Sequence, residues 1–250
     1  MHPILLKIGP VSLFSYGLML AVAALTCAWL LSRDARKHGI PSETIYDLMF
    51  WLVLSGIAGA RILYVVLHWE QFSGRPLEIL MVQSGGLSFQ GGFLAAAAAG
   101  AWYVRRQKLP ILFMLDLMAP YIALGHAIGR IGCFLNGCCY GRPASWGIYF
   151  PVHGARLQPT QLYDTAELFL VFLILRFSQK RSQVRGEVFA LYMALAGLQR
   201  FINEFFRGDH EHLMVEAVGL SVYQVFSLAI FAAGLAAWLV LRKSRPQKKA

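Results

Sequence analysis

Seven ionisable side chains interrupt the strongly apolar segments of the chain. They are Arg61, His126, Arg130, Glu167, Arg200, Glu204 and Arg207. An arginine at the centre of a membrane span costs ~2.5–3.5 kcal/mol on insertion scales, so each of these groups needs a specific reason to be there. His126 lies four residues before Arg130, so both lie on one helix face. Arg200 and Glu204 have the same spacing, and each pair can therefore point into the protein interior.

Two explanations for these charges are open. One is internal ion pairing, with Glu204 bound to Arg200 and Glu167 bound to Arg61 or Arg130. The arginines of the set outnumber its glutamates, which leaves about two positive charges in a low-dielectric environment. Water or an anion must neutralise such charges, and a phospholipid phosphate is the anion that a membrane supplies. The second explanation is therefore an anion site.

Glycine and other small residues accompany the charged positions. The stretches 85–92 and 129–143 are rich in glycine, which tolerates positive φ and leaves backbone N–H groups open to a ligand. They are tight turns or, beside buried arginines, a cradle for a phosphate or lipid headgroup. Small residues at 55–60 and 93–101 predict close helix packing within a membrane.

The composition favours an integral membrane protein. The chain has 250 residues, of which 57% are hydrophobic and 14% are charged. A soluble domain carries roughly 25% charged residues. The net charge of +10 does not indicate nucleic acid as a partner, because the basic residues cluster at the ends of apolar segments. These clusters are Arg33, Arg36 and Lys37; Arg105, Arg106 and Lys108; Lys180, Arg181 and Arg185; and Arg242, Lys243, Arg245, Lys248 and Lys249.

A bundle of about seven transmembrane helices is the predicted fold, in an all-α membrane protein. Spanning a bilayer takes roughly 20 apolar residues. The predicted spans are 11–31, 44–68, 91–104, 110–133, 161–178, 187–206 and 219–241. The third is short, so it draws on 86–90 or enters from a re-entrant loop. The start of the chain lacks the features of a cleaved signal peptide, so we expect the first span to remain as a helix.

The basic clusters predict the orientation of these spans. If each cluster is cytoplasmic, the N-terminus lies outside and the C-terminus lies in the cytoplasm. The segments expected to form a small extracytoplasmic region are 1–10, 69–90, 134–160 and 207–218. We expect one transmembrane domain over 1–243 and a short basic cytoplasmic tail over 244–250.

The four cysteines do not encode a disulfide scaffold. Cys27 lies inside an apolar span, so at most one disulfide is expected among Cys133, Cys138 and Cys139. Small packing residues at a tight outer turn are the other interpretation, and the redox state is open. No CxxC pair or Cys/His ligand set indicates a metal site.

Several segments together resemble the prolipoprotein diacylglyceryl transferases of bacterial inner membranes. The similar segments are 16–19, 59–61, 85–92, the signature GRIGCFLNGCCYG at 129–141, 159–163, and RFINEFFR at 200–207. The resemblance implies seven helices in a multi-pass protein of the bacterial cytoplasmic (inner) membrane. It implies transfer of the diacylglyceryl group of phosphatidylglycerol to the lipobox cysteine thiol of a preprolipoprotein. A thioether forms and glycerol-1-phosphate leaves. The expected partners are phosphatidylglycerol, membrane lipid and the lipobox segments of preprolipoproteins, and no cofactor or metal is expected. The oligomeric state is open, with a monomer favoured.

The resemblance also implies roles for individual residues. Arg130 and Arg200 would bind the phosphate and stabilise its developing charge, with Arg207 in support and Glu204 orienting an arginine. Carried over by motif, Tyr16, Asn136 and Gly141 would shape the lipid site. The further substrate-binding candidates are Arg61, Gly91, Gly92 and Gln161.

Position 90 departs from the common form of the family, which has a histidine there that is suggested as the base. Gln90 cannot take a proton at neutral pH, so it is expected to position the headgroup while the arginines favour the substrate thiolate. Cys133 and Cys138 replace Asn and Glu, although a Cys-Cys-Tyr-Gly version also occurs in the family. His126 is a substitute base or a hydrogen-bonded packing residue, and the identity of the base is open.

Two other functions compete with this interpretation. Arginines within a membrane and helices broken by glycine also occur in transporters or flippases for an anionic lipid or metabolite, but the chain lacks paired halves. A catalytically inactive family member that binds lipid or lipoprotein is the second, and it is suggested by Gln90 and Cys138.

Overall fold

The computed structural model describes residues 1–8, 11–81, 85–209, 214–215 and 219–244. The predicted cytoplasmic tail lies outside this part of the chain from residue 245 onward. The chain forms two compact units, Met1–Leu31 with Leu115–Ala250 as unit 1 and Ser32–Met114 as unit 2. Each unit is described by itself.

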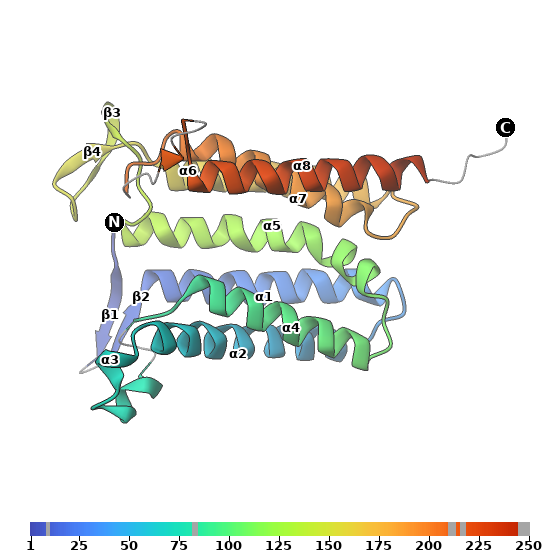
Figure 1. The fold of residues 1–250 in the computed structure, drawn as a ribbon, viewed down its shortest axis with the longest axis horizontal. Coiled ribbons are helices and arrows are strands. Elements are labelled where there is room, and N and C mark those ends of the chain that lie inside the picture. Colours follow the sequence, from blue (N-terminus) through green and yellow to red (C-terminus); the bar gives the residue numbers. More distant parts are fainter. Residues whose placement is uncertain (9–10, 82–84, 210–213, 216–218, 245–250) are drawn as a thin grey trace. The chain divides into compact units, whose positions relative to one another are not determined.

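Seven helices of 18 to 26 residues dominate the described part of the chain (Figure 1). They are α1 Ser15–Arg36, α2 Ser42–Leu67, α4 Phe89–Arg106, α5 Ile111–Asn136, α6 Thr160–Gln179, α7 Glu187–Glu204 and α8 Val222–Lys243. The bounds follow the predicted spans closely, and the prediction of a mainly helical protein is confirmed. The third predicted helix begins at Phe89, so it does draw on the segment before residue 91.

Four of these helices, α1, α2, α5 and α8, are long and apolar enough to cross a membrane. On α2, the apolar side chains of Phe50, Ile62 and Val66 are exposed, as expected for a surface that faces lipid. By contrast, α6 and α7 carry several charged residues within their length, and α4 ends in two arginines. The described residues therefore form a helical membrane protein.

Short antiparallel hairpins occupy segments where no strand was predicted. They pair β1 Ile4–Ile8 with β2 Val11–Phe14, β3 Pro143–Phe150 with β4 Ala155–Leu157, and β5 Met214–Val215 with β6 Leu220–Ser221. The prediction that the first helix begins at residue 11 is therefore wrong. Hydrophobicity alone does not distinguish a short strand from the first turn of a helix. Two further short helices, α3 Trp69–Phe72 and η1 Pro76–Leu80, lie in the segment between α2 and α4.

Unit 2 is built on close packing of α2 against α4, which run antiparallel (Figure 1). Gly59 faces Gly91 where the two backbones come closest. A Cβ added at Gly59 would lie 2.6 Å from the Gly91 carbonyl oxygen, and one at Gly92 would lie 3.0 Å from that of Gly56. Only glycine permits this approach, which confirms the predicted packing role of the small residues.

Unit 1 brings α5, α6 and α7 around a shared apolar core. Its buried members are Ala119 and Ala123 of α5, Val171 and Leu175 of α6, and Val188 of α7. Asp116 of α5 fixes the start of α7, because its carboxylate accepts hydrogen bonds from the backbone N–H groups of Gly186 and Phe189. These groups belong to the first turn of α7, whose N–H groups have no partner within the helix. The core packs the three helices that carry the polar residues against one another, and the cap fixes the opposite end of α7 from Gln199, Arg200 and Glu204.

Candidate functional site

Arg130 on α5 forms an ion pair with Asp164 on α6. Arg130 Nε lies 3.0 Å from Asp164 Oδ2, and the two side chains are 12% and 2% exposed. The N–H of Nε is not directed at a hydrogen-bond acceptor among the described residues, so the contact is ionic rather than a well-formed hydrogen bond. Two opposite charges this close and this buried attract strongly.

An amide joins this pair to a second carboxylate. Gln199 on α7 donates from Nε2 to Asp164 Oδ1 and, at 2.9 Å, to Glu167 Oε2. Asp164 and Glu167 lie one helical turn apart on the same face of α6, so a single amide can reach both. The result is a polar network that spans α5, α6 and α7 within unit 1.

Arg200 and Glu204 form a second pair at the end of α7. Arg200 Nη2 lies 2.6 Å from Glu204 Oε2, which confirms the pairing predicted from their spacing. The Glu204 Oε1 atom accepts from Ser221 Oγ at 3.4 Å, and Ser221 caps the N-terminus of α8. Arg200 Nη1 is buried and has no hydrogen-bond partner among the described residues. This side chain therefore retains a buried donor with no acceptor in the described part of the chain, and its guanidinium carbon lies 5.9 Å from the centre of the Tyr223 ring.

Arg207, just beyond α7, is held by Asp209. Its Nε donates to Asp209 Oδ1 at 2.9 Å and its Nη2 donates to Oδ2 at 2.6 Å, a bidentate arrangement. Burial lowers the pKa of the Arg207 guanidinium, but its hydrogen bonds to Asp209 and the charge of that carboxylate outweigh burial, so the net shift is upward. The positive charges of Arg207 and Arg130 both repel the positive charge of the Arg200 guanidinium.

Gly141 joins the segment after α5 to the segment after α7. Gly141 and Arg207 form a β-bridge, and Gly208 N–H donates to the Tyr140 carbonyl at 3.1 Å. A Cβ at Gly141 would lie 2.7 Å from the Phe206 carbonyl oxygen. The glycine therefore allows a backbone approach that keeps Arg207 beside the 129–141 signature.

The first turn of α6 holds the cysteine-containing turn that follows α5. Gln161 Nε2 donates to the Cys138 carbonyl at 2.6 Å, and Thr160 Oγ1 donates to the Cys139 carbonyl at 2.7 Å. Hydrogen bonds from the Cys133 and Cys138 thiols lower the pKa of Cys139, and the charge of Arg207 adds to this effect. Gln161, a predicted site residue, thus lies at the signature.

Two further predicted residues lie in unit 1 near this end of α5. Asn136 is the last residue of α5. Tyr16, near the start of α1, packs against Gly132, where an added Cβ would lie 3.3 Å from the Tyr16 ring. His126 is exposed on α5, one turn before Arg130.

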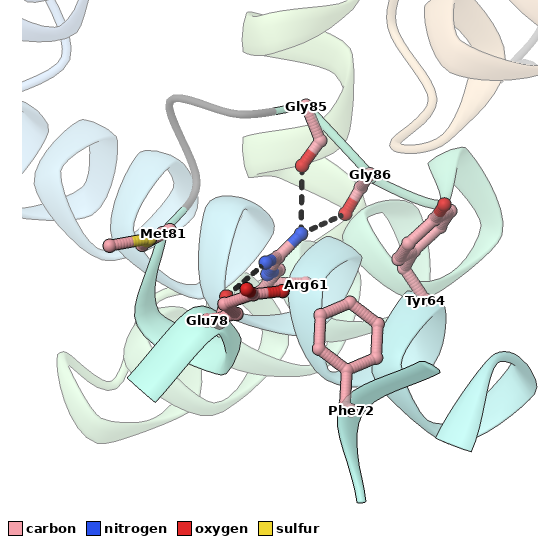
Figure 2. A pocket seen from close by; sticks show the side chains of 7 residues that line it. All are labelled: Arg61, Tyr64, Phe72, Glu78, Met81, Gly85 and Gly86. Atoms are coloured by element: carbon pink, nitrogen blue, oxygen red, sulfur yellow. Dashed lines mark hydrogen bonds between the residues drawn. The ribbon is translucent and has the colours of Figure 1, made fainter. Parts of the chain in front are cut away.

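Arg61 of unit 2 is buried and its guanidinium donates to four backbone carbonyls, and Figure 2 shows those of Glu78, Gly85 and Gly86. The acceptors are Glu78 and Ile79 of η1 and Gly85 and Gly86 before α4. The group borders a cavity of about 290 Å³ lined by Arg61, Tyr64, Phe72, Glu78, Met81, Gly85 and Gly86. Arg61 therefore ties the segment that precedes α4 to α2.

Gln90, Gly91 and Gly92 lie in the first turn of α4 in the same unit. Gln90 is exposed, and its Oε1 accepts from Ser88 Oγ at 3.0 Å. The two glycines form the contact with α2 described above.

The expected surplus of about two positive charges is wrong. Asp164 pairs with Arg130 and Asp209 pairs with Arg207, and neither aspartate was counted with the glutamates. The predicted partner of Glu167 is also wrong, since this carboxylate accepts from Gln199 and Arg130 pairs elsewhere. Reasoning from sequence also missed Gln199 and Asp116. The spacing of Asp164 and Glu167 on one face of α6 was the signal that could have identified the network.

The fold and this network define an integral membrane protein with paired arginines and carboxylates at one end of α5, α6 and α7. The family model for prolipoprotein diacylglyceryl transferase matches residues 3–240. The chain belongs to this family.

Individual relatives support the assignment along most of the chain. A protein of Pseudoalteromonas atlantica is 36% identical over 251 residues, which cover 96% of this chain and 90% of the relative. A Clostridium tetani protein is 32% identical over 216 residues, which cover 84% of this chain and 86% of the relative. A protein of Lactiplantibacillus plantarum is 30% identical over 263 residues, which cover 100% of this chain and 92% of the relative. All three are named phosphatidylglycerol–prolipoprotein diacylglyceryl transferase.

Proposed function

We propose that the chain transfers the diacylglyceryl group of phosphatidylglycerol to the lipobox cysteine thiol of a preprolipoprotein. The bond between the diacylglyceryl carbon and its phosphate oxygen breaks, a carbon–sulfur bond forms, and the thiol proton is lost. The products are a thioether and glycerol-1-phosphate. The family match over residues 3–240 and the substrates in the relatives' names support this reaction.

The structural observation that carries the proposal is the buried Nη1 of Arg200. A buried donor without a partner costs about 1–3 kcal/mol, so it is expected to meet an acceptor when the protein works. Arg200 Nη1 has no such partner among the described residues, and Arg130 and Arg207 act electrostatically on the same guanidinium. A phosphate oxygen would satisfy the donor. Its negative charge increases as the ester bond breaks, which is when the arginines stabilise it most.

Two buried acceptors suit the other end of the phosphatidylglycerol headgroup. Gln161 Oε1 and Asn203 Oδ1 are buried without a hydrogen-bond partner among the described residues. The terminal glycerol of the lipid carries two hydroxyl groups, and hydroxyl groups are hydrogen-bond donors. We assign Gln161 and Asn203 to recognition of these hydroxyl groups.

Asp164, Glu204 and Asp209 have a positioning role in this proposal. Each holds one arginine within 3.0 Å and offsets the cost of burying its charge. A guanidinium group held in this way needs no reorganisation when the phosphate charge develops. The carboxylates thus orient the arginines, as was expected for Glu204 alone.

Arg61 has a positioning role as well. Its donors are engaged by carbonyls of η1 and of the glycines before α4, so it acts on substrate through that segment. Gln90 is assigned to headgroup binding, because an amide cannot remove the thiol proton.

The membrane arrangement is part of the proposal. Arginines in the last turn of α1, the last turn of α4 and the last turn of α8 support cytoplasmic ends for these helices. We propose that all seven long helices cross the bacterial inner membrane, with the N-terminus outside, as a single domain over 1–243. A monomer is sufficient for this arrangement.

A transfer assay tests the function. Purified protein is incubated with phosphatidylglycerol and a lipobox peptide, and the peptide mass is measured. We expect a gain of one diacylglyceryl unit, and none on a matched peptide with serine in place of the cysteine. No gain on the cysteine peptide would favour the inactive lipid-binding member, and movement of unaltered lipid across vesicles would favour the transporter.

A further inference from the structure

Three cysteine thiols gather at the end of α5. Cys133 lies in the last turn of the helix, and Cys138 and Cys139 lie in the turn that follows. Their sulfur atoms all lie within 4.8 Å of one another, and all three cysteines are free. Within the described residues, no histidine or carboxylate belongs to the group.

The turn that presents these thiols is held from several directions. The Cys138 and Cys139 carbonyls accept hydrogen bonds from Gln161 and Thr160, whose side chains are fully buried. His153 Nε2 donates to the Gly137 carbonyl at 2.8 Å. These bonds hold the backbone of the turn, and the Cys138 thiol also contacts the Cys133 carbonyl at 3.7 Å. The fold thus holds the backbone that brings the thiols together.

Cys139 adopts a backbone conformation that side chains disfavour. Its φ is +61°, in the left-handed region where glycine is the usual residue. Such residues persist where the surroundings impose the conformation, and they concentrate at ligand-binding and active sites. Here the strained backbone brings a third sulfur to a pair that the helix and the turn already supply.

We propose that Cys133, Cys138 and Cys139 form a three-thiolate site for a thiophilic metal ion, Zn²⁺ or Cu⁺. Thiolate ligands select these ions over harder cations. Metal–sulfur bonds of about 2.3 Å place neighbouring sulfurs roughly 4 Å apart, a separation that the observed grouping approaches. On binding, the three thiols release their protons to solvent. Three protein ligands leave Zn²⁺ one position for water, or give Cu⁺ a trigonal site.

Nearby positive charge suits such a site. Three thiolates and one Zn²⁺ or Cu⁺ ion carry a net negative charge. The positive charges of Arg207 and Arg130 attract a negative charge on Cys139. A bound ion would tie the end of α5 to the turn before Gly141, between the segments that carry these two arginines. The bound ion would therefore make the segments that carry Arg130 and Arg207 more rigid. It would not take part in the transfer itself.

Metal retention by the full-length protein tests the proposal. The protein is reduced in detergent, stripped with a chelator and desalted. It is then loaded with Zn²⁺, or with Cu⁺ under anaerobic conditions, and metal per chain is measured by mass spectrometry after removal of free ions. We expect about one ion per chain from at least one metal, and at least a tenfold loss in a variant carrying Cys133→Ser, Cys138→Ser and Cys139→Ser.

Cys27 offers a matched control, because it is a buried cysteine outside the group whose Sγ contacts the Tyr121 carbonyl. Cys27→Ser should retain the ion. Equal retention by the wild type and the triple variant, or its loss in Cys27→Ser alone, would overturn the proposal.

Thiol alkylation of the wild type gives a second measurement that does not depend on variant folding. Metal should protect three thiols, identified by peptide mapping as Cys133, Cys138 and Cys139, and a chelator should restore their labelling. Unchanged labelling, or an isolated protein in which two of these thiols form a disulfide and which takes up no metal after reduction, would refute the site.

Discussion

Asp164 Oδ2 lies 3.0 Å from Arg130 Nε, so the arginine of the signature is buried with a carboxylate partner from the next helix. Arg200 and Arg207 have carboxylate partners too. These three arginines are therefore not bare positive charges. The carboxylates hold the three guanidinium groups in place. In the proposed function, a substrate phosphate binds the remaining buried donor of Arg200.

Removing the charge of Asp164 should strongly destabilise the protein. Asp164→Asn keeps the shape of the side chain but leaves Arg130 buried without its counter-charge, which costs about 3–5 kcal/mol. Thermal unfolding in detergent should show a large decrease in the unfolding temperature. Glu78→Gln, which breaks the exposed pair with Arg75, should cost less than about 1 kcal/mol and serves as the control. Similar losses in the two variants would show that the Arg130 pair contributes little.

The cap on α7 should be measurable independently of the site. Asp116→Ala removes the acceptor of the Gly186 and Phe189 N–H groups and should lower stability by about 0.5–2 kcal/mol. Asp116→Asn retains a side-chain oxygen that can accept one of these hydrogen bonds, so its stability should decrease less. Transfer activity per folded molecule should stay near wild type in both variants. Equal stability of the alanine variant and the wild type would argue against the cap.

Arg61 should act through the segment before α4. Arg61→Lys cannot satisfy four carbonyls that a planar guanidinium reaches together. We expect faster hydrogen exchange in residues 76–80 and 85–88, together with lower transfer activity. Arg75→Lys, at an exposed arginine, should change neither. Reduced activity with unaltered exchange would instead indicate that Arg61 contacts the substrate directly.

The glycine contact between α2 and α4 can be tested with a matched pair of substitutions. Gly59→Ala places a methyl group against the backbone of Gly91 and should cost about 1–3 kcal/mol. Gly74→Ala meets no atom within 4 Å and should be nearly neutral. Unfolding of both variants in detergent gives the comparison, and a neutral Gly59→Ala would show that the two helices separate easily.

Helix positions could be predicted because long apolar runs have few alternatives in a membrane. The predicted span 44–68 and the observed helix Ser42–Leu67 differ by at most two residues at either end. The hairpin of β1 and β2 could not be predicted, since its residues are as apolar as the helix that follows.

Contacts within the site were predictable only where they are local in sequence. Arg200 and Glu204 pair within one helix, so their spacing was sufficient. The pair of Arg130 and Asp164 depends on how α5 and α6 are rotated toward each other, which spacing does not determine. The three cysteines also required the fold, because their arrangement depends on the left-handed turn at Cys139.

The central claim is that buried arginines stabilise the departing phosphate, and the transfer rate of Arg200→Ala tests it most directly. The rate from phosphatidylglycerol to a lipobox peptide is measured for the wild type, Arg200→Ala, Arg130→Ala and Gln90→Ala, each checked for folding by thermal unfolding. Both arginine variants should lose at least ~10²-fold in rate, as expected for removal of a group that stabilises transition-state charge, whereas Gln90→Ala should only reduce the rate. A folded Arg200→Ala or Arg130→Ala protein that transfers the diacylglyceryl group at the wild-type rate would contradict the claim.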